Sequence, residues 1–143
     1  MTVLIDADGC PVIDITVKTA NQFGADCVII CDTSHIFEKP GVKTVIVSKG
    51  NDSVDFALVN MARKGDIVVT QDYGLAAMCL ARGAVCINQN GMFYSDKNID
   101  SLLMQRYASK KIRMGGGRMK GPAKRMPEQD KAFEQTLKKL LSE

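Results

Sequence analysis

The chain has 143 residues, 45% of them hydrophobic and 24% charged, a composition typical of one globular domain with its own core. It contains no run of about 18 apolar residues, which argues against a membrane span, and its first residues lack the pattern of a secretory signal. The net charge is +3 and the five cysteines form no C-x-x-C pair, so we expect a cytoplasmic protein with reduced thiols and no zinc site.

Five short apolar runs, rich in valine and isoleucine, occur in the first ninety residues. They do not alternate with polar residues, a pattern typical of strands that are buried on both faces of a parallel sheet. We therefore predict five strands, at Val3–Ile5, Cys27–Cys31, Val45–Val47, Ile67–Val69 and Ala84–Ile87.

Amphipathic helices are predicted in three of the four connections between these strands. The connection over residues 32–42 contains Pro40-Gly41 and has no helical period, so we predict a loop there. Strands that alternate with helices imply a doubly wound, three-layer α/β fold around a mostly parallel sheet. The predicted inner faces of the three helices are Ile13, Val17 and Ala20, then Val54, Ala57, Leu58 and Met61, then Leu75, Met78 and Cys79.

The last third of the chain is predicted to contain two further helices. One lies near Asn98–Tyr107, and the other begins at Pro127 and carries Phe133 and Leu137 on its apolar stripe. Residues 108–126 between them are basic and rich in glycine, so we predict a flexible loop. No repeat or change of composition marks a second domain, and residues 1–143 are predicted to form one.

The charged residues are unevenly distributed. Residues 106–125 contain eight cations and no acid, which leaves the rest of the chain with a net charge of −5. An acidic body with a basic segment indicates an anionic partner, and we expect contacts with nucleic-acid phosphates; a merely solvated segment is the alternative. The expected contact residues are Arg106, Lys110, Lys111, Arg113, Arg118, Lys120, Lys124 and Arg125.

Aspartates follow three of the predicted strands. Asp6 and Asp8 follow the first, Asp52 and Asp55 come after the third, and Asp72 comes after the fourth. Ligands of open α/β sheets bind beyond the carboxyl ends of the strands, so we expect these five side chains at one edge. An aspartate at a helix start is also a common N-cap, which is the alternative for Asp52 and Asp72.

Such a cluster of acids favours a divalent cation. Neighbouring carboxylates raise one another's pKa, and Mg²⁺ or Mn²⁺ would offset their repulsion through oxygen ligands. We predict that these five aspartates are the candidate ligands of such an ion. Because such an ion can activate water and stabilise charge on phosphate oxygens, the acids and the basic segment together favour phosphodiester hydrolysis.

Several motifs together resemble a known family. They are the segments Asp6–Val12 and Gly65–Ala77, the Ser34-His35 pair, Gly50-x-Asp52-x-x-Asp55 and Asn98-Ile99-Asp100. Over nearly the whole chain they resemble the bacterial YaiI/YqxD family, which is similar to PIN-like domains. The resemblance implies a PIN-like fold and the acid cluster of a metal-dependent ribonuclease, with RNA expected before DNA. By this resemblance the three acids are Asp6, Asp55 or Asp52, and Asp72, with Asp96 as a candidate for a fourth. We therefore predict that Asp6, Asp55 and Asp72 are the catalytic metal ligands, with Asp8 and Asp52 as outer or second-metal ligands.

Three other interpretations of these residues remain open. Asp6-x-Asp8 after a buried strand also looks like the nucleophile loop of haloacid-dehalogenase phosphatases, in which Asp6 would attack phosphorus and Asp8 would be the general acid. A nucleic-acid-binding module without catalysis is the second. Thiol chemistry at Cys10, with His35 as a neighbouring base, is the third.

Overall fold

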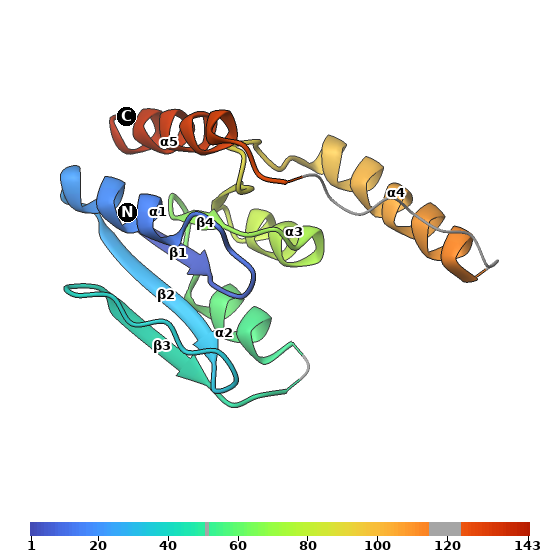
Figure 1. Ribbon diagram of the computed structural model, residues 1–143, viewed down its shortest axis with the longest axis horizontal. Helices are drawn as coiled ribbons and strands as arrows, with labels where there is room; N and C mark the ends of the chain where they lie inside the picture. The colour runs from blue at the N-terminus through green and yellow to red at the C-terminus, as the bar shows by residue number, and fades with distance from the viewer. Residues whose placement is uncertain (51, 115–123) are drawn as a thin grey trace.

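The computed structural model describes residues 1–50, 52–114 and 124–143, with the backbone alone for residues 106, 107 and 109–114. Its centre is a sheet of five strands, all parallel, in the order β3-β2-β1-β4-β5 (Figure 1). The predicted parallel sheet is confirmed, and each predicted run overlaps one strand. The strands are β1 (Thr2–Asp6), β2 (Asp26–Asp32), β3 (Lys43–Val47), β4 (Ile67–Val69) and β5 (Val85–Ile87).

The strand order reverses direction beside β1. The chain moves outward from β1 through β2 to β3, and then returns to the other side of β1 for β4 and β5. The carboxyl ends of β1 and β4 are therefore neighbours at the switch point, where open α/β sheets bind their ligands. Because Ile5 pairs with Val69, the residues that follow the two strands leave the sheet side by side.

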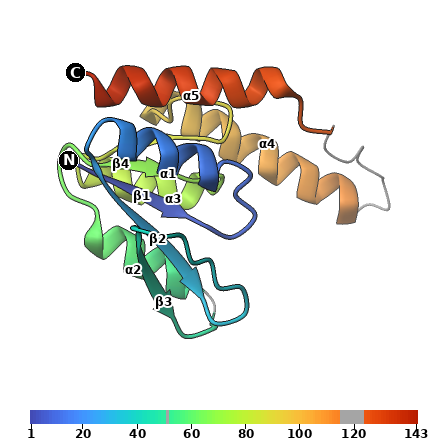
Figure 2. The ribbon, with the colours of Figure 1, turned by 60° about the vertical axis from the view of Figure 1, so that its left-hand side comes forward.

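Helices cover both faces of this sheet (Figures 1 and 2). One face packs on α1 and α5, and the other on α2, α3 and the first turns of α4. In β1, Val3 contacts the first layer and Leu4 the second, and both are at most 1% exposed. The doubly wound, three-layer fold is thus confirmed. The helices are α1 (Ile13–Gln22), α2 (Ser53–Met61), α3 (Tyr73–Ala81), α4 (Asp96–Met114) and α5 (Pro127–Leu141).

Two details differ from the predictions. Because α4 continues to Met114, residues 108–114 are helical, where we predicted a flexible loop. Those residues include no glycine or proline, and lysine, arginine, alanine and methionine favour helix. Met78, predicted to face inward, is 40% exposed, because Leu75, Ala76 and Cys79 form the buried side of α3.

The 19 residues of α4 extend away from the sheet in both ribbon views (Figures 1 and 2). Within the described part of the chain, no helix combines the length and the apolarity that a membrane crossing requires.

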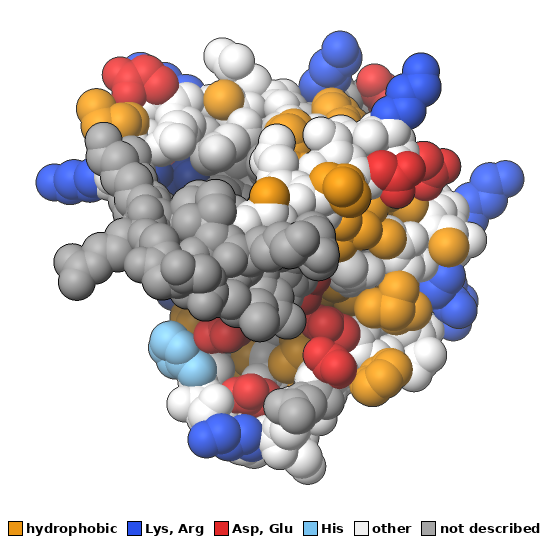
Figure 3. Space-filling view, turned by 90° about the vertical axis from the view of Figure 1, so that its right-hand side faces the viewer, with side chains coloured by type: hydrophobic (Ala, Val, Ile, Leu, Met, Phe, Trp, Pro, Cys, Tyr) orange, Lys and Arg blue, Asp and Glu red, His pale blue; other side chains and the backbone are white. Residues whose placement is uncertain are grey.

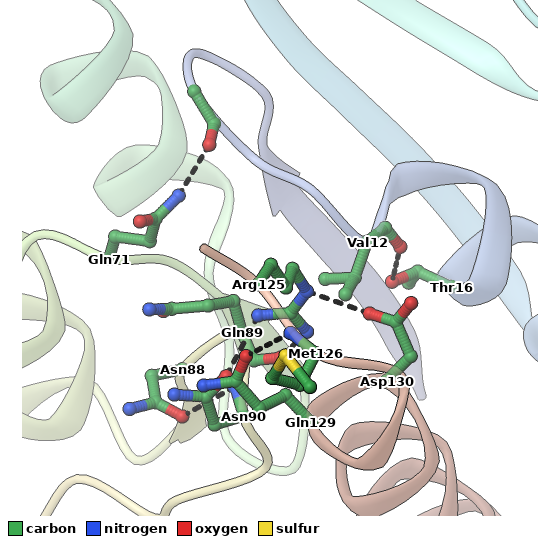
Figure 4. Close-up of polar contacts among 11 residues, drawn as sticks. Val12, Thr16, Gln71, Asn88, Gln89, Asn90, Arg125, Met126, Gln129 and Asp130 are labelled. Carbon is green, nitrogen blue, oxygen red and sulfur yellow. Dashed lines mark hydrogen bonds and ion pairs between the residues drawn. The ribbon is translucent and has the colours of Figure 1, made fainter. Parts of the chain in front are cut away.

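Arg125 ties α5 to the loop that follows β5 (Figure 4). Its Nε donates to Asp130 Oδ1 at 2.7 Å, in the first turn of α5. Its two terminal nitrogens donate to the Asn90 side-chain oxygen at 2.8 Å and to the Gln89 carbonyl at 2.6 Å. The guanidinium, only partly exposed, therefore holds the start of the last helix in place.

Candidate functional site

A cavity of about 780 Å³ opens at the carboxyl edge of the sheet. Figure 3 shows this side of the molecule, on which several acidic side chains gather. Val54, Gln71, Tyr73 and Gln105 are among the residues that line it, and no lysine, arginine or histidine does so within the described chain. The five aspartates of the predicted site all line the cavity, together with one more: Asp6, Asp8, Asp32, Asp52, Asp55 and Asp72.

Asp6 is the last residue of β1 and is half-buried. Loss of solvent is the main reason why its pKa rises to about 6 from an ordinary value of 3.8. The charges of Asp55, Asp72 and Asp8 raise this pKa further, while a hydrogen bond from Thr70 lowers it. The folded chain therefore favours a proton, or another positive charge, at this carboxyl group.

Thr70 connects the two acids at the switch point. Its hydroxyl donates to Asp6 Oδ2 at 2.8 Å and accepts the backbone N–H of Asp72 at 3.0 Å. Its carbonyl accepts the Tyr94 hydroxyl at 3.0 Å, and its side chain is buried. Thr70 thus sets the position of the Asp6 carboxylate relative to the start of α3, a role that the sequence analysis missed.

Asp72 is the N-cap of α3. Its Oδ1 accepts the backbone N–H groups of Gly74 at 2.9 Å and of Leu75 at 3.3 Å, so this residue does cap the helix. Both capping hydrogen bonds end on Oδ1, and among the described residues none is made to Oδ2, which could therefore bind a ligand. A structural role and a ligand role are therefore compatible at Asp72.

The other predicted acids approach the cavity from loops and from α2. Asp55, in the first turn of α2, is half-buried, and its pKa is raised by burial first and then by the charges of Asp72 and Asp52. Asp52 precedes α2 with a φ of 63°, and its side chain makes no capping hydrogen bond, unlike that of Asp72. Asp8 is exposed in the loop after β1.

Asp32 is the acid that the sequence analysis missed. It ends β2 as Asp6 ends β1, so an aspartate directly after the apolar run Cys27–Cys31 was the available signal. Its Oδ1 accepts the side-chain and backbone donors of Ser34, which hold its pKa below the ordinary range. Asp96, the candidate for a fourth acid, does not line the cavity.

The carboxylate oxygens in the cavity are suitable ligands for a hard cation, although the described side chains do not form a complete metal site. Among the described residues, no three His, Cys, Asp or Glu side chains are arranged to hold a metal ion. Carboxylate oxygens are nevertheless the ligands that Mg²⁺ and Mn²⁺ prefer. The raised pKa values of Asp6 and Asp55 reflect burial and mutual repulsion, both of which a cation would offset.

The predicted nucleic-acid contacts are described only in part. Lys124 is exposed, whereas Arg125 is held by Asp130, Asn90 and Gln89 as described above. For the four members in α4, the structure describes the backbone alone; these are Arg106, Lys110, Lys111 and Arg113. Two other members, Arg118 and Lys120, lie outside the described residues.

The environment of Cys10 does not support thiol chemistry. Burial raises the pKa of the Cys10 thiol to about 11, so the thiolate is disfavoured at neutral pH. The His35 ring stacks against Phe37, with 4.4 Å between the ring centroids. The structure thus offers no activated thiol at this position.

Comparison with known proteins gives relatives over the full length of the chain. The family model described as the uncharacterized YaiI/YqxD family matches residues 4–143. A UPF0178 protein of Exiguobacterium sibiricum is 49% identical over 143 residues, which cover 100% of this chain and 98% of that protein. A UPF0178 protein of Ruminiclostridium cellulolyticum is 54% identical over 138 residues, covering 96% and 90%. No solved structure matches the chain.

Proposed function

The chain belongs to the YaiI/YqxD family, and we propose that it is a metal-dependent phosphodiesterase that cleaves nucleic acid, RNA in preference to DNA. One observation carries the proposal: six aspartates line one cavity at the carboxyl edge of the sheet, among them an Asp6 whose pKa is raised to about 6. Such a concentration of negative charge opposes folding unless a cation joins it. A divalent ion and a phosphate substrate together satisfy the site.

The three central acids have distinct tasks in this proposal. Asp6, Asp55 and Asp72 would hold Mg²⁺ or Mn²⁺, directly or through water. Thr70 would keep the Asp6 carboxylate oriented through its hydroxyl, and the N-terminus of α3 would keep Asp72 in place. When bound, the ion would activate water and stabilise the charge that develops on phosphate oxygens. The outer positions fall to Asp8, Asp52 and Asp32.

The basic segment would supply the affinity for a polyanion. The acidic cavity repels phosphates in the absence of a cation, whereas the eight cations of residues 106–125 attract them from a distance. The helix α4 connects the two, because Gln105 lines the cavity and the basic residues follow directly in the chain. A strand held by this segment would thereby be brought to the acids.

The test compares metal binding and cleavage in the same samples. Mn²⁺ and Mg²⁺ are titrated into the wild type and into the Asp6→Asn/Asp72→Asn variant by calorimetry, and cleavage of a labelled single-stranded RNA is followed in parallel. We expect the wild type to bind the ion and to cleave. Because the double variant lacks two ligands, it should lose the heat of binding, and its cleavage should fall by more than about 100-fold.

A matched control is the Asp26→Asn/Asp100→Asn variant, which removes two exposed acids outside the cavity and should behave as the wild type. A wild type that binds no divalent ion would contradict the proposal. Metal binding without cleavage would favour a binding module, and a covalent aspartyl-phosphate on Asp6 would favour the phosphatase alternative.

A further inference from the structure

Tyr73 lies in the same cavity as the aspartates, as the first residue of α3 and directly after Asp72. Tyr73 is the one aromatic residue among the described residues that line the cavity. We propose that the Tyr73 ring is a stacking subsite for one unpaired nucleobase, which makes single-stranded nucleic acid the ligand class of this site. The inference rests on the proposed function and extends it from the phosphate to the base.

The Tyr73 ring is held in place by the core and by Tyr94. It is half-buried against the core cluster of α2, α3 and α4, and its centroid lies 6.3 Å from that of Tyr94, with 56° between the planes. Tyr94 is itself fixed, because it is 4% exposed and its hydroxyl donates to the Thr70 carbonyl. A ring that is ordered beforehand loses little freedom when a base stacks on it.

The position of Tyr73 relative to the acids suits a nucleotide. Asp72 and Tyr73 are consecutive residues, so their Cα atoms lie about 3.8 Å apart. Thr70 binds the Asp6 carboxylate with its hydroxyl and supports Tyr94 with its carbonyl, so one buried residue anchors the acids and the aromatic pair. Because Tyr73 and the acids line one cavity, a phosphate held at the acids would place its attached base within reach of the ring.

Gln105 adds a polar group for the edge of that base. Its side chain is exposed and lines the same cavity from α4. An amide offers a donor and an acceptor, which match the edge of any base whose pairing positions are free. In a duplex those positions are paired and both faces of the base are stacked. The ring and the amide together therefore select unpaired strands.

The test measures how much of the affinity depends on the bases. A fluorescein-labelled single-stranded RNA about ten nucleotides long and an abasic strand of equal length are titrated with protein by fluorescence anisotropy. Ca²⁺ replaces Mg²⁺ to neutralise the carboxylates, and the length of each strand is checked afterwards. We expect the wild type to bind the base-bearing strand about 5- to 150-fold more tightly, the range for stacking one base on an aromatic ring.

Three variants assign this preference to one ring. Tyr73→Phe keeps the aromatic face and should keep the preference, whereas Tyr73→Leu keeps an apolar contact with the core and should lose it. Phe56→Leu is the matched control, because Phe56 is an aromatic residue of α2 that is 62% exposed and does not line the cavity. It should bind both strands as the wild type does.

The proposal is overturned if Tyr73→Leu retains the preference, or if the wild type binds the two strands equally or binds neither. A duplex of the same sequence should bind no better than the abasic strand, and tighter binding of the duplex would also contradict it. Calorimetry with Mn²⁺ separates this inference from the proposed function. A Tyr73→Leu protein that binds Mn²⁺ normally has lost the base subsite alone, whereas a wild type that binds no Mn²⁺ but prefers the base-bearing strand contradicts only the metal-dependent function.

Discussion

At the scale of single residues, Asp6 shows how a strand end becomes a site. The apolar residues before it are buried by the sheet, and the following loop turns away, so its carboxyl group is left where burial and three neighbouring acids oppose its charge. Among the described residues, Thr70 alone supplies a hydrogen bond that lowers the pKa of Asp6. A residue that serves folding alone would not be expected in such an environment.

This environment predicts that the free energy of unfolding of the metal-free protein falls as Asp6 ionises. The pKa of Asp6 is about 6 in the folded state against 3.8 ordinarily, so its contribution to stability is lost as the pH rises through 6. Asp6→Asn cannot ionise and should therefore unfold less readily than the wild type at pH 8, by about 1–3 kcal/mol. Urea unfolding at pH 8 and at pH 4.5 measures this difference, which should shrink at the lower pH.

Saturating Mn²⁺ provides the internal control for this comparison. With the ion bound at pH 8, the wild type should become more stable than Asp6→Asn, because only the wild type retains the Asp6 ligand. An Asp6→Asn protein that is less stable than the wild type at both pH values, without metal, would contradict the raised pKa of Asp6.

At the scale of elements, the packing of α5 depends on a close approach of the chain at Gly91. This glycine has a φ of 79°, and the Thr136 hydroxyl of α5 donates to its carbonyl at 3.1 Å. A Cβ atom at this position would lie 2.6 Å from that hydroxyl oxygen and 2.8 Å from the Ala132 carbonyl oxygen. Only a residue without a side chain allows the loop after β5 and the helix to meet.

Gly91→Ala should therefore lower the free energy of unfolding by about 2–4 kcal/mol, through strain at positive φ and through overpacking against α5. Gly24→Ala is the matched control, because Gly24 has a similar φ of 67° but open space around it. It should cost about 1–2 kcal/mol, which is the backbone strain alone. Equal losses for the two variants, measured by urea unfolding, would show that contact with α5 contributes nothing at Gly91.

The helix α4 shows where local patterns mislead. Among the α4 side chains that the structure describes, Ile99 and Leu102 pack on the core, and the sequence analysis predicted an end near Tyr107. The helix continues to Met114, and the lysine, arginine, alanine and methionine residues of this stretch have high helix propensity.

At the scale of the whole molecule, opposite charges are separated between the cavity and residues 106–125. This separation predicts that RNA binding weakens steeply with salt, because each phosphate contact releases a counterion. Lys110→Gln/Lys111→Gln removes two charges of the basic segment, so the slope of log affinity against log salt should become shallower by about 1.4 for a single strand. Anisotropy titrations at several salt concentrations measure the slope.

The control for this prediction is Lys18→Gln/Lys43→Gln. These lysines line a groove near the amino ends of β1, β2 and β3, at the opposite edge of the sheet from the acids. Their loss changes the net charge equally but should leave the slope unchanged. If both variants changed the slope equally, the effect would be one of total charge and not of the basic segment.

The sequence by itself determined the local features of this protein. Buried strands appear as unbroken apolar runs, helices appear as periodic ones, and the residue after a run must lie at the carboxyl edge. That reasoning predicted the five strands, the three-layer fold and the positions of Asp6, Asp8, Asp52, Asp55 and Asp72 at one cavity. The same rule applied to the second run would have added Asp32.

Only the tertiary structure decided which distant residues meet. It brings Gln105 from α4 to the cavity of the acids. It also places Thr70 between Asp6 and Asp72, and it pairs Arg125 with Asp130 of α5. A local pattern indicates which face of an element is buried, but not which other element covers that face. Those contacts depend on strand order and on the packing of helices from separate parts of the chain, because the free energy of burial is shared among residues far apart in the sequence.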